Sequence, residues 1–431
     1  MKFNGRFYDL TGTVHLSTAV VFFIAVCCLF PLPFPHAASS ISPGNPLQDG
    51  AIIVSPGGVF ELGFFSPGSS KNRYLGIWYR NSAAAVAVWV ANRESPVPNS
   101  FGSLAIAADG NLVILDGDGR NLWSTNVSLP LASTPVAALL DSGNLVLKTS
   151  DAIEWQSFEH PTDTYLPGMK VGLDLRTNVN HVFSSWQSSG DPAPGNFTMG
   201  MDPDRSTQIV IWENGDPCWR SGRWNGQTFI GVEGMVPEYI YGFRLNNFES
   251  EEEMYFYYNV FNSTQRFVLT PDGVAKQLLR EDSGDLWTEI WAQPSVECEI
   301  YNRCGDYASC SDGVNNSPVC SCLKGFVPQP GGGCRRRMPL QCERNTTAGD
   351  KPDGFFLMPG VKLPDLSDWD PVSLNESQCK QSCSTNCSCK AYSFVTGIGC
   401  LVWARDLVDI HIFSTGGNDL YLRLAGEELG E

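Results

Sequence analysis

An internal repeat between residues 43 and 162 constrains the fold of this chain more than any other feature. The segment Asp109-Gly-Asn-Leu-Val-Ile-Leu115 returns as Asp141-Ser-Gly-Asn-Leu-Val-Leu147, which places the two asparagines 33 residues apart. Tryptophan recurs with a similar period, at Trp89, Trp123 and Trp155. Each unit alternates apolar and polar residues around a Gly-Asn turn, as β-hairpins do. The repeat therefore predicts three small sheets that pack their tryptophans around a shared axis, which is a β-prism.

The composition extends the β prediction to the rest of the chain. A length of 431 residues suits two to four domains. The sequence has 42 glycines and 28 prolines, with 11% aromatic and only 17% charged residues. This balance favours short strands and turns over long helices. We expect a mostly β protein with little helix.

The N-terminus predicts secretion. Lys2 and Arg6 precede an apolar run from Ala19 to Phe30, and small residues follow at Ala37 and Ala38. Such a run is too short to span a bilayer but has the length of a signal-peptide core. Residues 1–38 are thus predicted to be a signal peptide, and no later apolar stretch has the length of a membrane anchor. The formal net charge of −17 disfavours nucleic acid and anionic lipid as partners and favours a basic one.

Thirteen cysteines follow the predicted signal peptide, and twelve of them lie between Cys298 and Cys400. Dense cysteines in a secreted protein indicate disulfides, because small segments cannot bury enough surface to be stable alone. Zinc is the competing interpretation, but the spacing lacks paired C-x-x-C motifs. Seven N-x-S/T motifs also predict a glycosylated surface. They begin at Asn126, Asn196, Asn262, Asn315, Asn345, Asn375 and Asn386.

Several long segments resemble one known family. They include Phe60-Glu-Leu-Gly-Phe-Phe-Ser-Pro-Gly68, Val88-Trp-Val-Ala-Asn-Arg-Glu94, Trp155-Gln-Ser-Phe-Glu-His-Pro-Thr-Asp163, Trp219-Arg-Ser-Gly-Arg-Trp-Asn-Gly226 and Cys400-Leu-Val-Trp-Ala-Arg-Asp-Leu-Val-Asp409. These segments look like plant S-locus glycoproteins and the ectodomains of G-type lectin S-receptor-like serine/threonine-protein kinases. The resemblance covers essentially the whole chain after the signal peptide.

The resemblance implies four domains after the signal peptide. Residues 39–162 would form a bulb-type lectin domain with the β-prism fold, and residues 163–293 a second lectin-like β domain typical of S-locus glycoproteins. Residues 294–335 would form a small disulfide-rich EGF-like module. Residues 342–425 would form an α+β PAN/apple domain, in which 376–385 is the best helix candidate of the chain.

The resemblance also implies disulfide pairs, whereas spacing alone leaves fifteen pairings open for six cysteines. For the EGF-like module it implies Cys298 with Cys310, Cys304 with Cys320, and Cys322 with Cys334. For the PAN/apple domain it implies Cys379 with Cys400, Cys383 with Cys389, and Cys342 with Cys387. Cys218 is then left over, either buried or free for an intermolecular bond, and burial is favoured.

The bulb lectins bind mannose through a Q-x-D-x-N-x-V-x-Y motif, which this sequence keeps only in part. Asp109, Asn111 and Val113 match, but Ala107 and Leu115 replace the glutamine and the tyrosine. The second copy has Asp141 and Asn144 one residue too far apart. Asp-Gly-Asn is also a good turn sequence. We therefore favour a turn here over a mannose site.

No catalytic, cofactor or metal site is predicted. The nucleophile-elbow, zinc-protease and phosphate-loop motifs are all missing, and His160 is interpreted as part of a turn. The acidic run Glu249 to Glu253 is interpreted as a solvated loop. The basic run Arg335 to Arg337 has three interpretations, namely a cleavage site, a contact to acidic glycans and a solvated tether, of which the tether is favoured.

The preferred hypothesis is a non-catalytic extracellular recognition glycoprotein that binds a secreted protein or peptide ligand. The resemblance implies a role in pollen recognition or defence signalling. The chain would be a soluble protein that partners a receptor kinase or forms a homodimer. Alternatively, it would be the outer part of a plasma-membrane receptor kinase that continues beyond Glu431. The alternatives are a mannose-binding lectin and a secreted hydrolase that uses a carboxylate pair such as Asp202 and Asp204.

Overall fold

The computed structural model of the chain is built almost entirely from β-sheets. It describes residues 40–430 except for 83–85, 130–133, 151, 178, 205, 236, 238–242, 249–252, 260–263, 281–285 and 345–350. The predicted signal peptide lies outside the described residues. The described strands form six four-stranded sheets, one eight-stranded sheet and one two-stranded ribbon. Among the described residues, no helix combines the length and the apolar character needed to cross a membrane.

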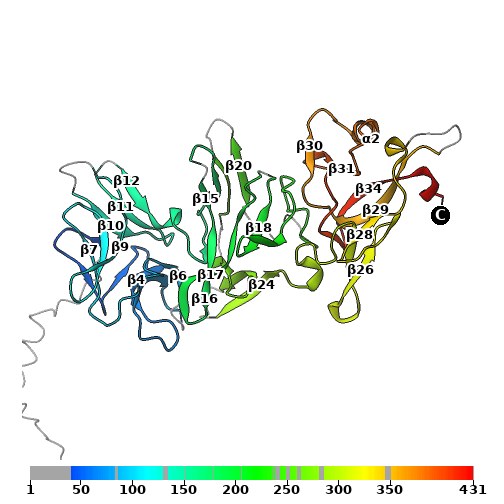
Figure 1. Ribbon diagram of the computed structural model, residues 1–431. Coiled ribbons are helices and arrows are strands. Elements are labelled where there is room, and N and C mark those ends of the chain that lie inside the picture. The colour runs from blue at the N-terminus through cyan, green and yellow to red at the C-terminus, as the bar shows by residue number, and fades with distance from the viewer. Residues whose placement is uncertain are drawn as a thin grey trace, which may run out of the picture. The chain divides into compact units, whose positions relative to one another are not determined.

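The first three sheets form the predicted lectin prism, drawn blue to cyan in Figure 1. One sheet contains β3 (Ile52–Val54), β4 (Phe60–Phe65), β5 (Tyr74–Tyr79) and β6 (Ala87–Val90). The next contains β2 (Leu47–Gln48), β7 (Ser103–Ile106), β8 (Leu112–Leu115) and β9 (Asn121–Ser124). The third contains β1 (Ser40–Ile41), β10 (Val136–Leu139), β11 (Leu145–Lys148) and β12 (Ile153–Gln156).

The sequence repeat is reproduced in the strand register. Ile106 pairs with Leu112 across the β7–β8 turn, and Leu139 pairs with Leu145 across the β10–β11 turn. The turns contain Gly110 and Gly143, both at φ 86°, a conformation that glycine adopts without steric cost.

The three repeated tryptophans meet at the axis of the lectin prism. The ring centroids lie 6.2 Å apart for Trp89 and Trp123, 5.9 Å for Trp89 and Trp155, and 5.7 Å for Trp123 and Trp155. All three pairs are edge-to-face, the arrangement that aromatic rings prefer. The predicted β-prism is confirmed.

A second prism follows, drawn green in Figure 1. Its first sheet contains β16 (Phe183–Ser188), β17 (Asp191–Met201), β18 (Ile209–Glu213) and β19 (Asp216–Arg220). Its second contains β15 (Val179–His181), β14 (Val171–Asp174), β21 (Glu253–Tyr257) and β20 (Arg244–Phe248). Its third contains β13 (Thr164–Tyr165), β22 (Thr264–Leu269), β23 (Ala275–Arg280) and β24 (Trp287–Gln293). The second lectin-like β region thus repeats the three-sheet architecture.

The two prisms share one hydrophobic core, which runs from Ile41 to Ala275. Arg93 follows β6 of the lectin prism in the chain, and its side chain is buried against β16 of the second prism. Its guanidinium donates to the carbonyls of Ser185 at 2.7 Å and Ser184 at 3.1 Å, and to Oγ of Ser184 at 2.6 Å. A buried guanidinium that is this well hydrogen-bonded joins the two prisms firmly.

The C-terminal region centres on an eight-stranded sheet, drawn yellow to red in Figure 1. In spatial order it contains β26 (Pro318–Cys322), β25 (Ala308–Asp312), β33 (Ile410–Ile412), β29 (Gly354–Lys362), β34 (Asn418–Leu424), β31 (Ala391–Val395), β32 (Gly399–Trp403) and β30 (Asp368–Asp370). A two-stranded ribbon, β27 (Phe326–Pro328) with β28 (Cys334–Arg336), follows β26 in the sequence. Short 3₁₀ turns connect the elements, at Ser157–Glu159, Glu297–Glu299, Val314–Asn316, Gln341–Glu343 and Gly426–Glu428.

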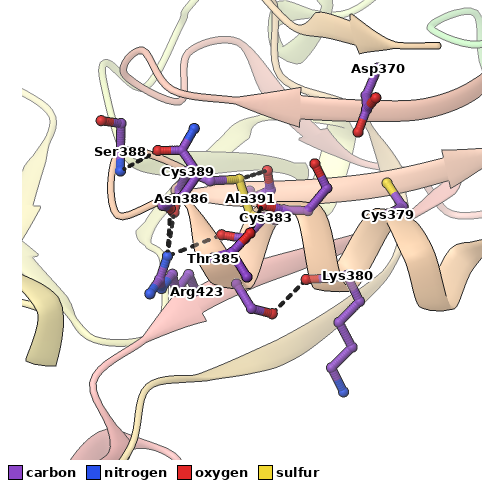
Figure 2. The surroundings of a disulfide bond; sticks show 12 residues. Asp370, Cys379, Lys380, Cys383, Thr385, Asn386, Ser388, Cys389, Ala391 and Arg423 are labelled. Carbon is purple, nitrogen blue, oxygen red and sulfur yellow. Dashed lines mark hydrogen bonds between the residues drawn. A yellow bond between two sulfur atoms is a disulfide. The ribbon is translucent and has the colours of Figure 1, made fainter. Parts of the chain in front are cut away.

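The one α-helix of the described residues is α2 (Glu376–Thr385), as predicted. Asn375 caps its N-terminus, because the side-chain oxygen accepts a bond from the backbone N–H of Gln378 at 3.0 Å. Cys379 and Cys383 occupy the buried face one turn apart. Figure 2 shows the disulfide that links Cys383 to Cys389, with the Arg423 guanidinium donating to the carbonyl of Asn386 at 2.8 Å.

Candidate functional site

The partial mannose motif lies in the β7–β8 turn of the lectin prism, and its asparagine serves the fold. Asn111 is buried, and its side-chain oxygen accepts bonds from the N–H of Val127 at 2.7 Å and from the hydroxyl of Thr125 at 2.9 Å. Its amide nitrogen donates to the carbonyl of Val127 at 3.1 Å. Val113 is also buried, whereas Asp109 is exposed and accepts a bond from the Asn111 N–H at 3.0 Å.

The second copy of the motif uses the same chemistry. The Asn144 side-chain oxygen accepts from the hydroxyl of Ser157 at 3.2 Å and the N–H of Phe158 at 3.2 Å. Asp141 accepts a bond from the N–H of Gly57 at 2.7 Å and so ties the third sheet to the first. The side chains of Asn111 and Asn144 therefore form their hydrogen bonds within the chain itself. Of the motif residues at the β7–β8 turn, only Asp109 has a side chain that faces solvent.

The twelve clustered cysteines form six disulfides, which are the pairs that the resemblance implied. They are Cys298–Cys310, Cys304–Cys320, Cys322–Cys334, Cys342–Cys387, Cys379–Cys400 and Cys383–Cys389. With all twelve sulfurs oxidised, none of them is a thiolate that could bind zinc.

Cys218 is the one free cysteine among the described residues and lies half-buried on β19. Burial, with a further contribution from Glu213, raises the pKa of its thiol to about 11. Since the thiolate is the reactive form, this cysteine is poorly reactive at neutral pH.

Five of the predicted glycosylation sites can be placed, and all five asparagines are exposed. They are Asn126, Asn196, Asn315, Asn375 and Asn386. The other two, Asn262 and Asn345, lie outside the described residues.

The acidic run Glu249 to Glu253 and the basic run Arg335 to Arg337 differ in how far the structure describes them and in the contacts they make. Residues 249–252 of the acidic run lie outside the described residues, and Glu253 pairs with Lys170 at 2.8 Å. The tether interpretation of the basic run was wrong for two of its residues. Arg336 donates to the carbonyl of Arg423 at 3.0 Å, and Arg337 binds the Glu428 carboxylate at 2.8 Å. These bonds fix the run to the C-terminal sheet.

His160 is part of the packing and has no catalytic partner nearby in the described chain. Its ring stacks on Trp155 with centroids 5.2 Å apart, and burial lowers the pKa of its imidazole. Its carbonyl accepts a bond from the Trp89 indole at 2.8 Å, which helps to hold the tryptophan triad.

A buried ion cluster joins the second prism to the C-terminal region, and sequence reasoning missed it. The Asp409 carboxylate accepts from Arg220 at 2.6 Å and pairs with Lys362 at 2.9 Å. Burial alone would raise the pKa of Asp409, but Lys362 and Arg220 outweigh burial, and the pKa is lowered. Because the cluster pairs residues up to 189 positions apart, no local pattern announces it.

A polar cavity of about 290 Å³ opens beside this cluster. The Gln208 side chain at its floor donates to Asp202 at 2.9 Å and to Asp365 at 3.0 Å. Exposed Asp204, Asp368 and Arg405 also line it. Asp202 and Asp204 both line this polar cavity, where Asp202 is held by hydrogen bonds from Ser206 and Gln208.

Comparison with known proteins identifies three kinds of domain. Residues 86–187 match the D-mannose binding lectin family, residues 219–330 the S-locus glycoprotein domain, and residues 342–410 the PAN-like domain. Three regions of the chain thus match lectin, S-locus glycoprotein and PAN-like family models.

Its relatives among characterised sequences are receptor-like kinases of Arabidopsis thaliana. The chain is 41% identical to the G-type lectin S-receptor-like serine/threonine-protein kinase B120, over 99% of this chain and 51% of the relative. It is 37% identical to the receptor-like serine/threonine-protein kinase SD1-8, over 95% of this chain and 49% of the relative. The chain is therefore similar over nearly its whole length to about half of each of these G-type lectin S-receptor-like kinases, and the resemblance seen in the sequence is confirmed. It spans about half the length of the relatives it matches.

Among solved structures, monocot mannose-binding lectins from Gastrodia elata match 28% of this chain and 96% of their own, with 21% identity and a TM-score of 0.23. The snowdrop (Galanthus nivalis) mannose-specific agglutinin matches with 17% identity and a TM-score of 0.21. Likeness at this level adds nothing to the fold, which rests on the strand pairing.

Proposed function

We propose that this chain is a non-catalytic extracellular recognition module that binds a secreted protein or peptide rather than a mannose-type sugar. One observation carries the proposal. The asparagine that the lectin motif would offer to a sugar is buried and bonded to Thr125 and Val127. A buried amide whose bonds are already made gains nothing by exchanging them for a hydroxyl of a ligand.

The charge of the chain supports a basic ligand. The formal net charge is −17, and exposed Asp204 and Asp368 line the polar cavity between the second prism and the C-terminal region, where they outnumber the one exposed arginine, Arg405. Exposed carboxylates at a cavity rim attract a basic partner and raise its association rate. Ligand recognition in pollen or defence signalling, as the resemblance implies, is part of the proposal.

An extracellular or plasma-membrane location fits the covalent chemistry. Six disulfides need an oxidising compartment, and the five described sequon asparagines are exposed where a glycan could attach. The relatives are named as kinases, and whether this chain is the outer part of such a receptor belongs to the proposal. A transcript read beyond the codon for Glu431 tests it, since a membrane span and kinase motifs in frame are the expected finding for a receptor.

The ligand class can be tested with a displayed peptide library on the purified glycoprotein. We expect enrichment of basic peptides, with binding reduced about tenfold or more in the double variant Asp204→Asn/Asp368→Asn. Asp118→Asn/Asp272→Asn is the matched control, because it removes the same number of charges from exposed carboxylates at turns that do not line the cavity. Equal loss in the control would mean that net charge alone, and not the cavity, attracts the peptides.

The second candidate is a mannose-binding lectin, favoured by the match to the D-mannose binding lectin family. Calorimetric titration with methyl α-mannoside separates the two candidates. We expect no heat of binding at millimolar sugar. Saturable binding that Asp109→Ala abolishes would establish the lectin instead, and this variant removes an exposed side chain together with its bond from the Asn111 N–H.

A further inference from the structure

The second prism contains an apolar cavity of about 400 Å³ that is lined by residues from all three of its sheets. Aromatic rings contribute to each wall, with Trp219 from β19, Phe256 from β21, Phe267 from β22 and Trp291 from β24. The volume falls in the range of roughly 300–1,000 Å³ that small-molecule pockets occupy in proteins.

The few polar groups at the cavity wall are bonded to the protein. The Tyr165 hydroxyl donates to the carbonyl of Phe256 at 3.1 Å, and the Ser221 hydroxyl donates to the carbonyl of Gly222 at 2.9 Å. One N–H of the Gln277 amide donates to Gln265 at 2.7 Å, and the side-chain oxygen remains able to accept a bond.

The one carboxylate at the rim is also engaged. Glu233 accepts bonds from the N–H and the hydroxyl of Ser414, each at 2.6 Å, and from the N–H of Thr415 at 3.0 Å. Among the described residues that line the cavity, none offers a free charge to an occupant. A charged ligand would lose its hydration without gaining an ion pair, which excludes it energetically.

An apolar space of this size forfeits packing contacts along its whole wall when it is empty. Water does not replace them, because an apolar wall gives water too few hydrogen-bond partners. Binding of an apolar molecule would recover this lost contact energy.

We propose that the cavity of the second prism binds an uncharged, mainly apolar small molecule, with the Gln277 side-chain oxygen as acceptor for a single hydroxyl. This site is independent of the peptide ligand proposed above. It lies between different residues and selects for the opposite kind of chemistry.

The purified chain can be titrated with Nile red, a neutral apolar dye that fluoresces when it leaves water. We expect saturable binding of one dye per chain. Naphthylmethanol should displace the dye at least about tenfold better than naphthoate, because the carboxylate of naphthoate finds no counter-ion in the cavity.

Two filling variants locate the site. Ala275→Phe and Met199→Trp each place a larger side chain in the cavity and should weaken dye binding about tenfold or more. Phe101→Ser removes an exposed aromatic ring from the lectin prism and should leave the affinity unchanged. Circular dichroism establishes that each variant is folded, and two different filling positions guard against one that is not.

Three results would overturn the proposal. Unchanged affinity in both folded filling variants would place the dye elsewhere, and loss in Phe101→Ser would place it on the exposed surface. No binding by the unmodified chain would mean that its own segments already occupy the cavity.

Discussion

The two prisms have the same three-sheet architecture but differ in what lies between the sheets. The lectin prism closes its axis with three tryptophans in mutual edge-to-face contact. The second prism surrounds an apolar cavity with aromatic rings that line it without filling it. The same architecture therefore tolerates either a packed or a hollow centre.

The prisms also differ in how well their buried polar groups are satisfied. Among the described residues of the lectin prism, every buried side-chain nitrogen and oxygen has a hydrogen-bond partner. The second prism holds unpartnered atoms at Ser185, Trp186, Arg266 and Trp287. Proteins retain buried polar atoms without hydrogen-bond partners where function requires them, and these atoms lower the folding stability. The second prism thus leaves several buried polar atoms without a partner, whereas the described part of the lectin prism leaves none.

The largest difference in the free energy of unfolding is expected for substitutions at the centres of the two prisms. Trp155→Ala should lower the free energy of unfolding by about 4 kcal/mol, because it removes one third of a closely packed centre. Trp291→Ala, which enlarges an existing cavity, should cost only about 2 kcal/mol. Urea unfolding followed by tryptophan fluorescence and circular dichroism measures both. Equal costs would erase the distinction between a packed and a hollow prism.

The next effect concerns buried asparagines. Asn111→Ala removes the acceptor of the Thr125 hydroxyl proton and leaves both backbone groups of Val127 without that side-chain partner, which should cost about 3 kcal/mol. Asn180→Ala in the second prism breaks a single bond, to the carbonyl of Met201, and removes an unpartnered oxygen. We expect about 1 kcal/mol for this matched change. The same urea assay decides, and a larger loss for Asn180→Ala would reverse the comparison.

Two buried carboxylates should respond with opposite signs. Burial raises the pKa of Asp163 to about 6, even though Arg93 and Arg266 act to lower it. The folded state therefore binds more protons than the unfolded state between about pH 4 and 6, and stability falls as pH rises through this window. Asp163→Asn should stabilise the protein by roughly 2 kcal/mol at pH 7 and have almost no effect at pH 4.

Asp49 of the lectin prism is the matched control, since its buried carboxylate is paired with Arg73. Asp49→Asn leaves the guanidinium without its counter-ion and should destabilise by about 2 kcal/mol. Thermal unfolding of both variants at pH 4 and pH 7 gives the signs. Destabilisation by Asp163→Asn at pH 7 would show that its charge is better compensated than its burial indicates.

The smallest effect tests spare volume. Ala275→Leu adds carbon to the hollow prism and should stabilise it by about 0.5–1 kcal/mol. Ala137→Leu adds the same atoms to the packed prism, where Ala137 is fully buried, and should cost about 1–2 kcal/mol. Differences of this size appear as shifts of a few degrees in the melting temperature, measured side by side. Destabilisation by both would mean that the cavity is already filled.

The sequence predicted the features that repeat or that match the family. The 33-residue period was sufficient for the tryptophan axis, and the helix at Glu376–Thr385 begins and ends as expected. The cavities could not be predicted, because they depend on residues such as Tyr165 and Trp291 that only the fold brings together. The second prism has no clear repeat, so its three sheets were expected only through the resemblance. The buried ion cluster could not be predicted from the sequence either, because Arg220 and Asp409 are 189 residues apart and only the fold brings them together.

One pairing in the C-terminal sheet has a mechanical consequence. Strand β25, from the segment with the EGF-like cysteine spacing, runs parallel to β33 from the PAN-like region, with Cys310 opposite His411. Two modules that share a sheet cannot swivel about the chain between them. Bending of one module against the other would have to break the pairing of β25 with β33, so the shared sheet resists a force or a torque applied across this region.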